Sequence, residues 1–135
     1  LAGAKVRDLE GMRAAAAAIL ALGVPAVLLK GGHLDETEAP EAAAAEVPDA
    51  VVRVDGAVHE VRGPRVTTRA SHGTGCTLSS ALATLAGAGL SWDDALERAK
   101  PWLADAMRAG EALAVGDASR PTWHGPVDHG HAQRG

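Results

Sequence analysis

The sequence contains no phenylalanine or tyrosine and only three tryptophans, so it lacks the aromatic platforms on which nucleic-acid bases stack. Its 13 basic residues do not exceed its 17 acidic ones, which also argues against a nucleic-acid partner. A single cysteine, Cys76, excludes an internal disulfide and suits a reducing compartment, so we expect a cytoplasmic protein. No apolar run reaches the roughly 18 residues that a membrane span requires, and we expect no membrane partner.

What the chain does contain is a hydrophobic content of 47%, much of it alanine, in 135 residues. That length suits one domain, and we treat residues 1–135 as a single partial domain. A core of Leu, Val and Ile packed against small residues has little apolar area, so we expect it to need a partner surface. The first residue is Leu1 rather than Met, which indicates either processing or an incomplete gene product.

Apolar residues recur at helical spacing between Asp8, a candidate N-cap, and Gly23, a candidate helix stop. A short apolar run from Ala26 to Lys30 then predicts a buried strand, and a helix followed by such a strand is half of a βαβ unit. Gly31-Gly32-His33 follows at the carboxyl end of this strand, which is the edge where ligands bind in open parallel sheets.

Residues 35–49 have no clear period and are predicted to form a surface loop. Two apolar segments flank Asp55-Gly56, which predicts a β-hairpin at residues 51–62 because this dipeptide favours a two-residue turn with positive φ. Residues 64–68 could extend the second strand. His59 alternates with its apolar neighbours and is predicted to face solvent.

Two long helices are predicted in the C-terminal half. The first begins within 73–77 and ends at Gly87 or Gly89, with leucines on one face. The second begins at the capping sequence Ser91–Asp94 and continues to Leu113, although Pro101 should kink or split it. After these helices, residues 116–135 are rich in Pro, Gly and His and are predicted to form an irregular tail.

The chemistry is concentrated in residues 71–77, a glycine-rich turn that opens the first of these helices. Glycines let the backbone present several N–H groups in one direction, and the helix dipole adds positive potential, so the turn suits an anion. Cys76 lies in the first helical turn, where a thiol is shifted towards thiolate and can take a proton. Glycine-rich turns are nevertheless common before helices, and a free cysteine is often a small buried hydrophobe, so the residues alone leave both interpretations open.

Residues His72–Ser79 resemble the signature of the hydroxymethylpyrimidine (phosphate) kinases of the ribokinase-like superfamily. Most ribokinase relatives have Gly-Ala-Gly-Asp at this position, whereas this branch has a cysteine. Residues Val27–His33 and His124–His129 also resemble stretches of that family, in the same order. The resemblance implies an α/β fold, specifically the C-terminal half of a ribokinase-like three-layer α/β/α fold.

The resemblance also implies a function and residue roles. Cys76 would be the general base, and the backbone N–H groups from Gly73 through Thr74 and Gly75 to Cys76 would form the anion hole. Lys30 would lie near the nucleotide phosphates; the less favoured alternative is a solvated lysine at a strand end. The implied reaction is ATP- and Mg²⁺-dependent phosphorylation of 4-amino-5-hydroxymethyl-2-methylpyrimidine and its monophosphate in thiamine diphosphate biosynthesis. Related thiazole kinases share Gly-Thr-Gly-Cys, but His72 and the Thr77–Ser79 segment favour the pyrimidine branch.

Members of this family are about twice as long, and their pyrimidine pocket and acidic magnesium motif come mainly from the N-terminal half. We therefore expect a complementary N-terminal half, or a homo-oligomer, as partner. One alternative is a catalytically silent fragment that binds nucleotide phosphate or a partner chain through the same turn. Another is a cysteine hydrolase in which His72 activates Cys76.

The tail carries His124, His129 and His131, a spacing that could bind a metal. We interpret it instead as the family's His-Gly-Pro motif followed by a disordered end, and we assign no metal site from the sequence.

Overall fold

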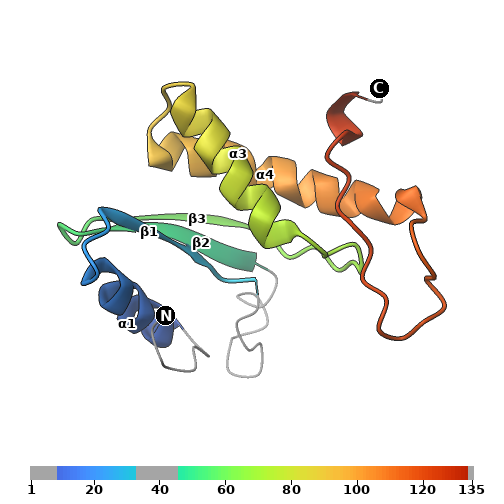
Figure 1. Ribbon diagram of the computed structural model, residues 1–135, viewed down its shortest axis with the longest axis horizontal. Helices are drawn as coiled ribbons and strands as arrows, with labels where there is room; N and C mark the ends of the chain where they lie inside the picture. The colour runs from blue at the N-terminus through green and yellow to red at the C-terminus, as the bar shows by residue number, and fades with distance from the viewer. Residues whose placement is uncertain (1–8, 33–45, 134–135) are drawn as a thin grey trace. The chain divides into compact units, whose positions relative to one another are not determined.

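The computed structural model describes residues 9–32 and 46–133, which belong to two compact units, Leu1–Arg65 and Val66–Gly135 (Figure 1). Within these residues, no helix combines the length and apolar character needed to cross a membrane. The helices and strands are α1 (Leu9–Leu20), β1 (Ala26–Lys30), β2 (Glu46–Arg53), β3 (Val58–Pro64), α3 (Thr74–Gly87), α4 (Trp92–Gly110) and the 3₁₀ turns η2 (Glu111–Leu113) and η3 (His131–Gln133).

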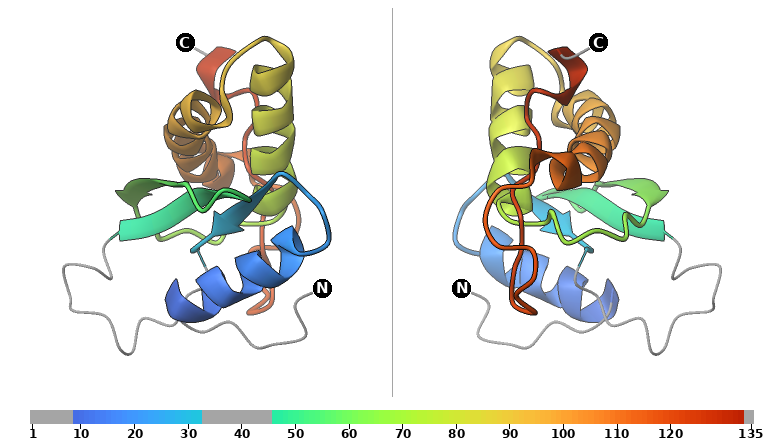
Figure 2. Two further views of the ribbon diagram at one scale, coloured as in Figure 1. Left: turned by 90° about the vertical axis from the view of Figure 1, so that its left-hand side faces the viewer. Right: turned by 90° about the vertical axis from the view of Figure 1, so that its right-hand side faces the viewer.

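In the first unit, α1 lies along one face of a three-stranded antiparallel sheet of order β1-β2-β3 (Figures 1 and 2). Met12 and Ala16, one helical turn apart, form the buried stripe of α1. The helix stops where the sequence predicts: Gly23 has φ +92° and its N–H donates to Leu20 O at 2.9 Å. The predicted N-cap, Asp8, lies outside the described residues.

The predicted hairpin is confirmed, with its turn at Asp55-Gly56, where Gly56 has φ +86°. The predicted loop 35–49 is wrong at its end, because β2 already begins at Glu46; residues 35–45 lie outside the described part of the chain. Pro48 and Asp49 look like loop residues locally. In the folded chain both residues accept a hydrogen bond from the Gly31 N–H. The Gly31 nitrogen lies 2.9 Å from Pro48 O and 3.0 Å from an Asp49 carboxylate oxygen.

β1 pairs with β2 in antiparallel fashion, and its first four residues are half-buried rather than buried. A parallel neighbour, as a βαβ unit requires, would have to come from outside the described residues. The prediction for His59 is wrong: β3 alternates in exposure, with His59 and Val61 half-buried and Val58 53% exposed. Because side chains alternate along a strand, a predicted alternation that is shifted by one position assigns every residue to the opposite face. β3 ends at Pro64, so residues 65–68 do not extend it.

In the second unit, α3 and α4 pack side by side (Figure 2). Leu78 of α3 and Leu96 of α4 are completely buried, and such burial contributes about 2 kcal/mol for each side chain. α3 has the predicted bounds. The predicted cap of α4 is also confirmed, since the Asp94 N–H donates to Ser91 Oγ at 3.1 Å.

α4 is one continuous helix through Pro101, so the predicted split does not occur. Pro101 is exposed and has no N–H to donate to the carbonyl four residues earlier. That carbonyl lies on the solvent side of the helix, where water can donate to it instead. The helix ends at Gly110 rather than at Leu113, which belongs to η2.

Apart from η3 and one isolated β-bridge, the tail (residues 116–135) is irregular as far as Gln133, as predicted, but it is not detached. Val127 and Asp128 are only 2% and 7% exposed, and the Asp128 N–H donates to Ala106 O of α4 at 2.9 Å. The interpretation of a disordered end is therefore wrong up to Gln133. Gly110 makes this packing possible, because a Cβ there would lie 2.5 Å from Pro126 O and 2.7 Å from Ala70 Cβ.

We predict that Gly110→Ala destabilises the chain by about 1–3 kcal/mol, since backbone must move to admit the methyl group. The matched control is Gly87→Ala in α3, where an added Cβ meets nothing within 4 Å and the better helix former should be neutral or stabilising. Urea unfolding of both variants measures the difference. Equal stability of the two variants would contradict the close packing of the tail on α4.

Candidate functional site

The glycine-rich turn (residues 71–77) begins α3 through a left-handed glycine. Gly73 is the N-cap with φ +84° and ψ 3°, a conformation that residues with a Cβ rarely adopt. The Thr77 N–H donates to Gly73 O at 2.9 Å, which is the first hydrogen bond of the helix. The sequence therefore enters the helix directly from a tight turn.

This entry leaves backbone donors available at the N-terminus of α3. Within residues 9–32 and 46–133, the N–H groups of Gly73, Gly75 and Cys76 have no hydrogen-bond acceptor, and that of Thr74 lies 3.5 Å from Ser71 O. A Cβ placed on Gly73 or Gly75 would meet nothing within 4 Å, so the turn is open on that side. Unpaired N–H groups at a positive helix end stabilise an anion.

Cys76 is exposed, which contradicts the interpretation of a buried structural cysteine. Among the described residues, no hydrogen bond joins its thiol to a histidine, and His72 is itself exposed. The cysteine hydrolase alternative needs such an activating contact, so the geometry does not favour it. The geometry instead leaves an exposed thiol beside the unpaired N–H groups of Gly73 and Gly75.

Backbone hydrogen bonds join the glycine-rich turn to the tail. The His72 N–H donates to Gly125 O at 3.0 Å, and the Gly125 N–H donates to Arg69 O at 2.9 Å. The first of these bonds belongs to a short parallel bridge between His72 and Pro126. A weaker contact of 3.3 Å joins Ser71 Oγ to His124 Nδ1.

Arg69 organises the loop that leads back to this bridge. Its guanidinium donates to Ala118 O at 3.1 Å, to Trp123 O at 3.2 Å and to Arg120 O, and it lies 5.1 Å from the centre of the Trp123 ring. The Trp123 indole N–H in turn donates to Val115 O at 2.8 Å. Sequence reasoning missed Arg69, because a single arginine before the glycine-rich turn carries no pattern that predicts three carbonyl partners.

Asp117 closes a small turn in the same loop. The Ser119 hydroxyl, which donates to the carboxylate at 2.6 Å, is the main reason that the pKa of Asp117 lies below its ordinary value. The Ser119 N–H and the Arg120 guanidinium act in the same direction. This carboxylate is fully exposed, so it shapes the loop without adding measurable stability.

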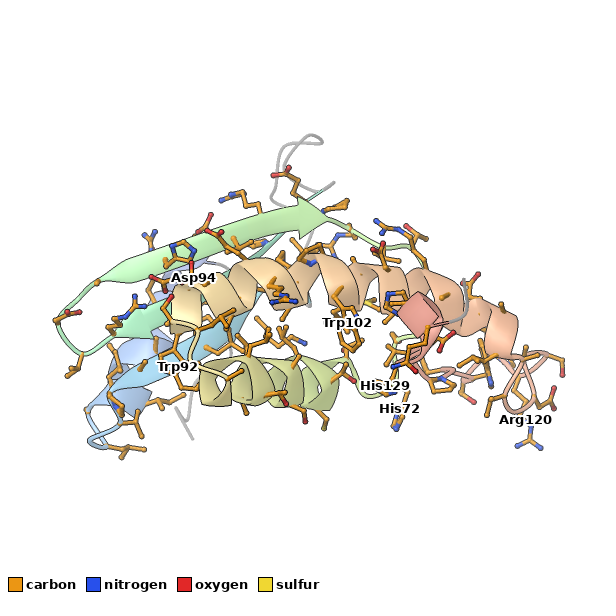
Figure 3. All side chains as sticks on the ribbon, turned by 90° about the horizontal axis from the view of Figure 1, so that it is seen from above. His72, Trp92, Asp94, Trp102, Arg120 and His129 are labelled. Carbon is orange, nitrogen blue, oxygen red and sulfur yellow. The ribbon has the colours of Figure 1, made fainter. Side chains whose placement is uncertain are left out.

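A side chain of the tail also contacts the turn directly. His129 Nε2 lies 2.9 Å from Thr77 Oγ1, and the centre of its ring lies 6.4 Å from that of Trp102 on α4 (Figure 3). The sequence placed His129 in a family motif, but nothing in it indicated that Thr77 would be its partner.

The structure thus brings Gly73, Thr74, Gly75 and Cys76 together in one turn. Lys30, the other predicted site residue, is the exposed last residue of β1 in the first unit, and its role as a nucleotide-binding residue stays a prediction. His33 lies outside the described residues. Within the described ranges, no group of three or more His, Cys, Asp or Glu side chains is placed to hold a metal ion.

Comparison with known proteins points to one group of enzymes. The model of the phosphomethylpyrimidine kinase family matches residues 1–124. The chain is 50% identical over 103 residues to the thiamine biosynthesis multifunctional protein ThiED of Corynebacterium efficiens, covering 76% of this chain and 12% of that protein. It is 40% identical over 126 residues to the hydroxymethylpyrimidine/phosphomethylpyrimidine kinase of Salmonella typhimurium, covering 93% of this chain and 42% of that protein.

Among solved structures, the chain is similar to the pyridoxal kinase of Staphylococcus aureus in complex with AMP-PCP. The TM-score is 0.76 at 27% identity, over 96% of this chain and 42% of that one. This likeness confirms the predicted α/β class and the relation to ribokinase-like kinases. The chain spans less than half the length of each of these three proteins.

We predict that tripolyphosphate, a phosphate chain without a nucleoside, slows the alkylation of Cys76 by iodoacetamide several-fold. An anion held by the N–H groups of the turn would lie beside the thiol and block the approach of the uncharged reagent. The measurement is the alkylation rate at matched ionic strength, and it reads a single site because the chain has one cysteine. Unchanged rates in tripolyphosphate would argue against an anion site at this turn.

Proposed function

Because this chain belongs to the phosphomethylpyrimidine kinase family, we propose that it provides the phosphate-binding turn and the proton acceptor for ATP-dependent phosphorylation of hydroxymethylpyrimidine and its monophosphate. The observation that carries the proposal is the exposed thiol of Cys76 in the first turn of α3, next to the unpaired N–H groups of Gly73 and Gly75. An anion hole and a proton acceptor side by side are what phosphoryl transfer to an alcohol requires.

In this proposal the Cys76 thiolate accepts the hydroxyl proton of the pyrimidine as the hydroxyl oxygen attacks the γ-phosphorus of ATP. The bond between that phosphorus and the bridging oxygen breaks, and ADP leaves with its electron pair. The N–H groups of Gly73, Thr74, Gly75 and Cys76 stabilise the negative charge on the transferred phosphoryl group. A positioned proton acceptor of this kind is worth about 10²–10⁴ in rate.

The described residues fit a phosphate group but not a magnesium site. The turn offers donors to an anion, whereas no cluster of acidic or histidine side chains in residues 9–32 and 46–133 could coordinate a cation. We therefore propose that the Mg²⁺ ligands belong to the part of the kinase that this chain does not cover, and we assign no step to them here.

The relatives support a pyrimidine substrate over pyridoxal. Identity is 40% to the Salmonella typhimurium pyrimidine kinase and 27% to the Staphylococcus aureus pyridoxal kinase, over similar shares of the chain. The resemblance of His72 and the Thr77–Ser79 segment to the pyrimidine kinase signature also favours a pyrimidine substrate.

We propose further that the chain acts with a complementary half of the same fold, or within a homo-oligomer that supplies it. The chain spans 42% of the Salmonella typhimurium kinase, so more than half of such an enzyme lies outside it. Within the described residues, one edge of β1 has no neighbouring strand, which suits the addition of another strand. Lys30 at the end of β1 is proposed to approach the nucleotide phosphates in the completed enzyme.

We predict that the chain alone turns over the alcohol hydroxymethylpyrimidine and ATP slowly or not at all. Adding the part of the Salmonella typhimurium kinase that the chain does not match should restore activity, because it supplies the missing strands and cation ligands. ADP formation by each component and by the mixture measures this effect. A mixture no more active than the chain alone, despite forming a complex, would contradict the proposed function.

In that active mixture, Cys76→Ala should lower kcat by about 10²–10⁴ while ADP still binds, since the variant removes the proton acceptor and keeps the backbone donors. The matched control is Ser80→Ala, an exposed residue of α3 whose side chain makes no contact that the mechanism uses. Full activity in Cys76→Ala would exclude Cys76 as the base even if complementation succeeds.

A further inference from the structure

His129 contacts the glycine-rich turn from a position 52 residues away in the sequence. Its Nε2 lies 2.9 Å from the hydroxyl of Thr77, which directly follows Cys76 and is 7% exposed. The hydrogen bond therefore joins the tail to the first turn of α3 at the residue next to the proposed base.

Two other hydroxyls of α3 show what Thr77 would do without this partner. Ser79 Oγ donates to Gly75 O at 3.0 Å, and Thr84 Oγ1 donates to Ser80 O at 2.9 Å, in each case the carbonyl four residues back. The same bond from Thr77 would go to Gly73 O, which already accepts the Thr77 N–H and forms the first turn of the helix. Back-bonding of this kind bends helices, so it would disturb the N–H groups of the turn.

His129 is itself held against α4. The preceding residue, Asp128, is 7% exposed; its N–H donates to Ala106 O at 2.9 Å, and its carboxylate accepts from the Gly130 N–H at 2.9 Å. The imidazole also lies against Trp102 of α4, at 6.4 Å between ring centres (Figure 3). A fixed backbone turn and a ring contact thus determine where Nε2 points.

We propose that His129 is a positioning residue for the phosphate-binding turn: by engaging the Thr77 hydroxyl it keeps the first turn of α3, and with it the N–H groups of Gly75 and Cys76, in the geometry that binds phosphate. This inference rests on the proposed function, because it assumes an anion at the turn. His129 does not touch the substrate and acts only through Thr77. In the completed enzyme its loss lowers kcat and leaves the KM of the pyrimidine alcohol unchanged.

The test uses the full 135-residue chain and needs no turnover. The rate of Cys76 alkylation by iodoacetamide is measured against tripolyphosphate concentration, which gives an apparent affinity for the anion. His129→Ala should weaken this affinity roughly 2- to 10-fold, the effect of one net hydrogen bond. His129→Gln should restore it, since the glutamine amide can donate to or accept from the Thr77 hydroxyl.

Two further variants separate positioning from general stability. His131→Ala is the matched control: His131 also lies against Trp102, at 5.6 Å between ring centres, and its Nδ1 lies 2.9 Å from Asp128 O, but among the described residues Thr77 Oγ1 bonds to His129 and not to His131. It should keep wild-type affinity. Thr77→Val removes the same hydrogen bond from the other side at equal volume, so it serves if His129→Ala does not fold, and the double variant should lose no more than either single one.

The outcomes distinguish the two proposals. Suppose tripolyphosphate protects Cys76 in the wild-type chain and protects it equally in His129→Ala and in Thr77→Val. This result overturns the role of His129 and leaves the proposed function standing. A His129→Gln variant as impaired as His129→Ala also overturns it, because the hydrogen bond would not be the cause. Absence of protection in the wild-type chain overturns the anion site and this inference together.

Discussion

Two backbone hydrogen bonds fix the place of the candidate site: His72 N–H donates to Gly125 O, and Gly125 N–H donates to Arg69 O. They join the segment that enters the glycine-rich turn to the returning tail. Because the left-handed conformation of Gly73 follows immediately, the direction in which α3 starts depends on this bridge. The close approach of the tail to Gly110 and the burial of Val127 keep the bridge against α4.

The site therefore combines a local and a long-range component. The donors and the thiol come from four consecutive residues, Gly73 to Cys76, and could form wherever a helix begins in this way. Their fixed geometry depends on Arg69, on the loop that its guanidinium organises, and on His129. In the proposed function, a turn supported on both sides would hold phosphate without rearranging, which is the condition for electrostatic stabilisation of a transferred phosphoryl group. The cation ligands and the pocket for the pyrimidine are assigned to the part of the fold that the chain does not span.

Features that depend on neighbouring residues could be predicted from the sequence: the Asp55-Gly56 turn, the stop at Gly23, the cap at Ser91 and the start of α3. The errors arise where distant residues decide. Pro48 and Asp49 belong to a strand because they pair with Arg62 and Val61 of β3, and His59 lies on the half-buried face because of the register of the sheet. Pro101 is tolerated in α4 because it faces solvent, and the tail is ordered because α4 offers it a surface. The proposed role of Cys76 rests on a resemblance, because the residues of the turn alone leave a functional and a structural thiol both open.

The most direct test of the central claim is an amide ¹H–¹⁵N spectrum of the 135-residue chain during titration with tripolyphosphate. If the N-terminus of α3 binds phosphate, the largest shifts occur at the N–H groups of Gly73, Gly75 and Cys76, with smaller shifts along the bridge at His72 and Gly125. Shifts confined to other parts of the chain, with these five amides unchanged at saturating tripolyphosphate, would contradict the account.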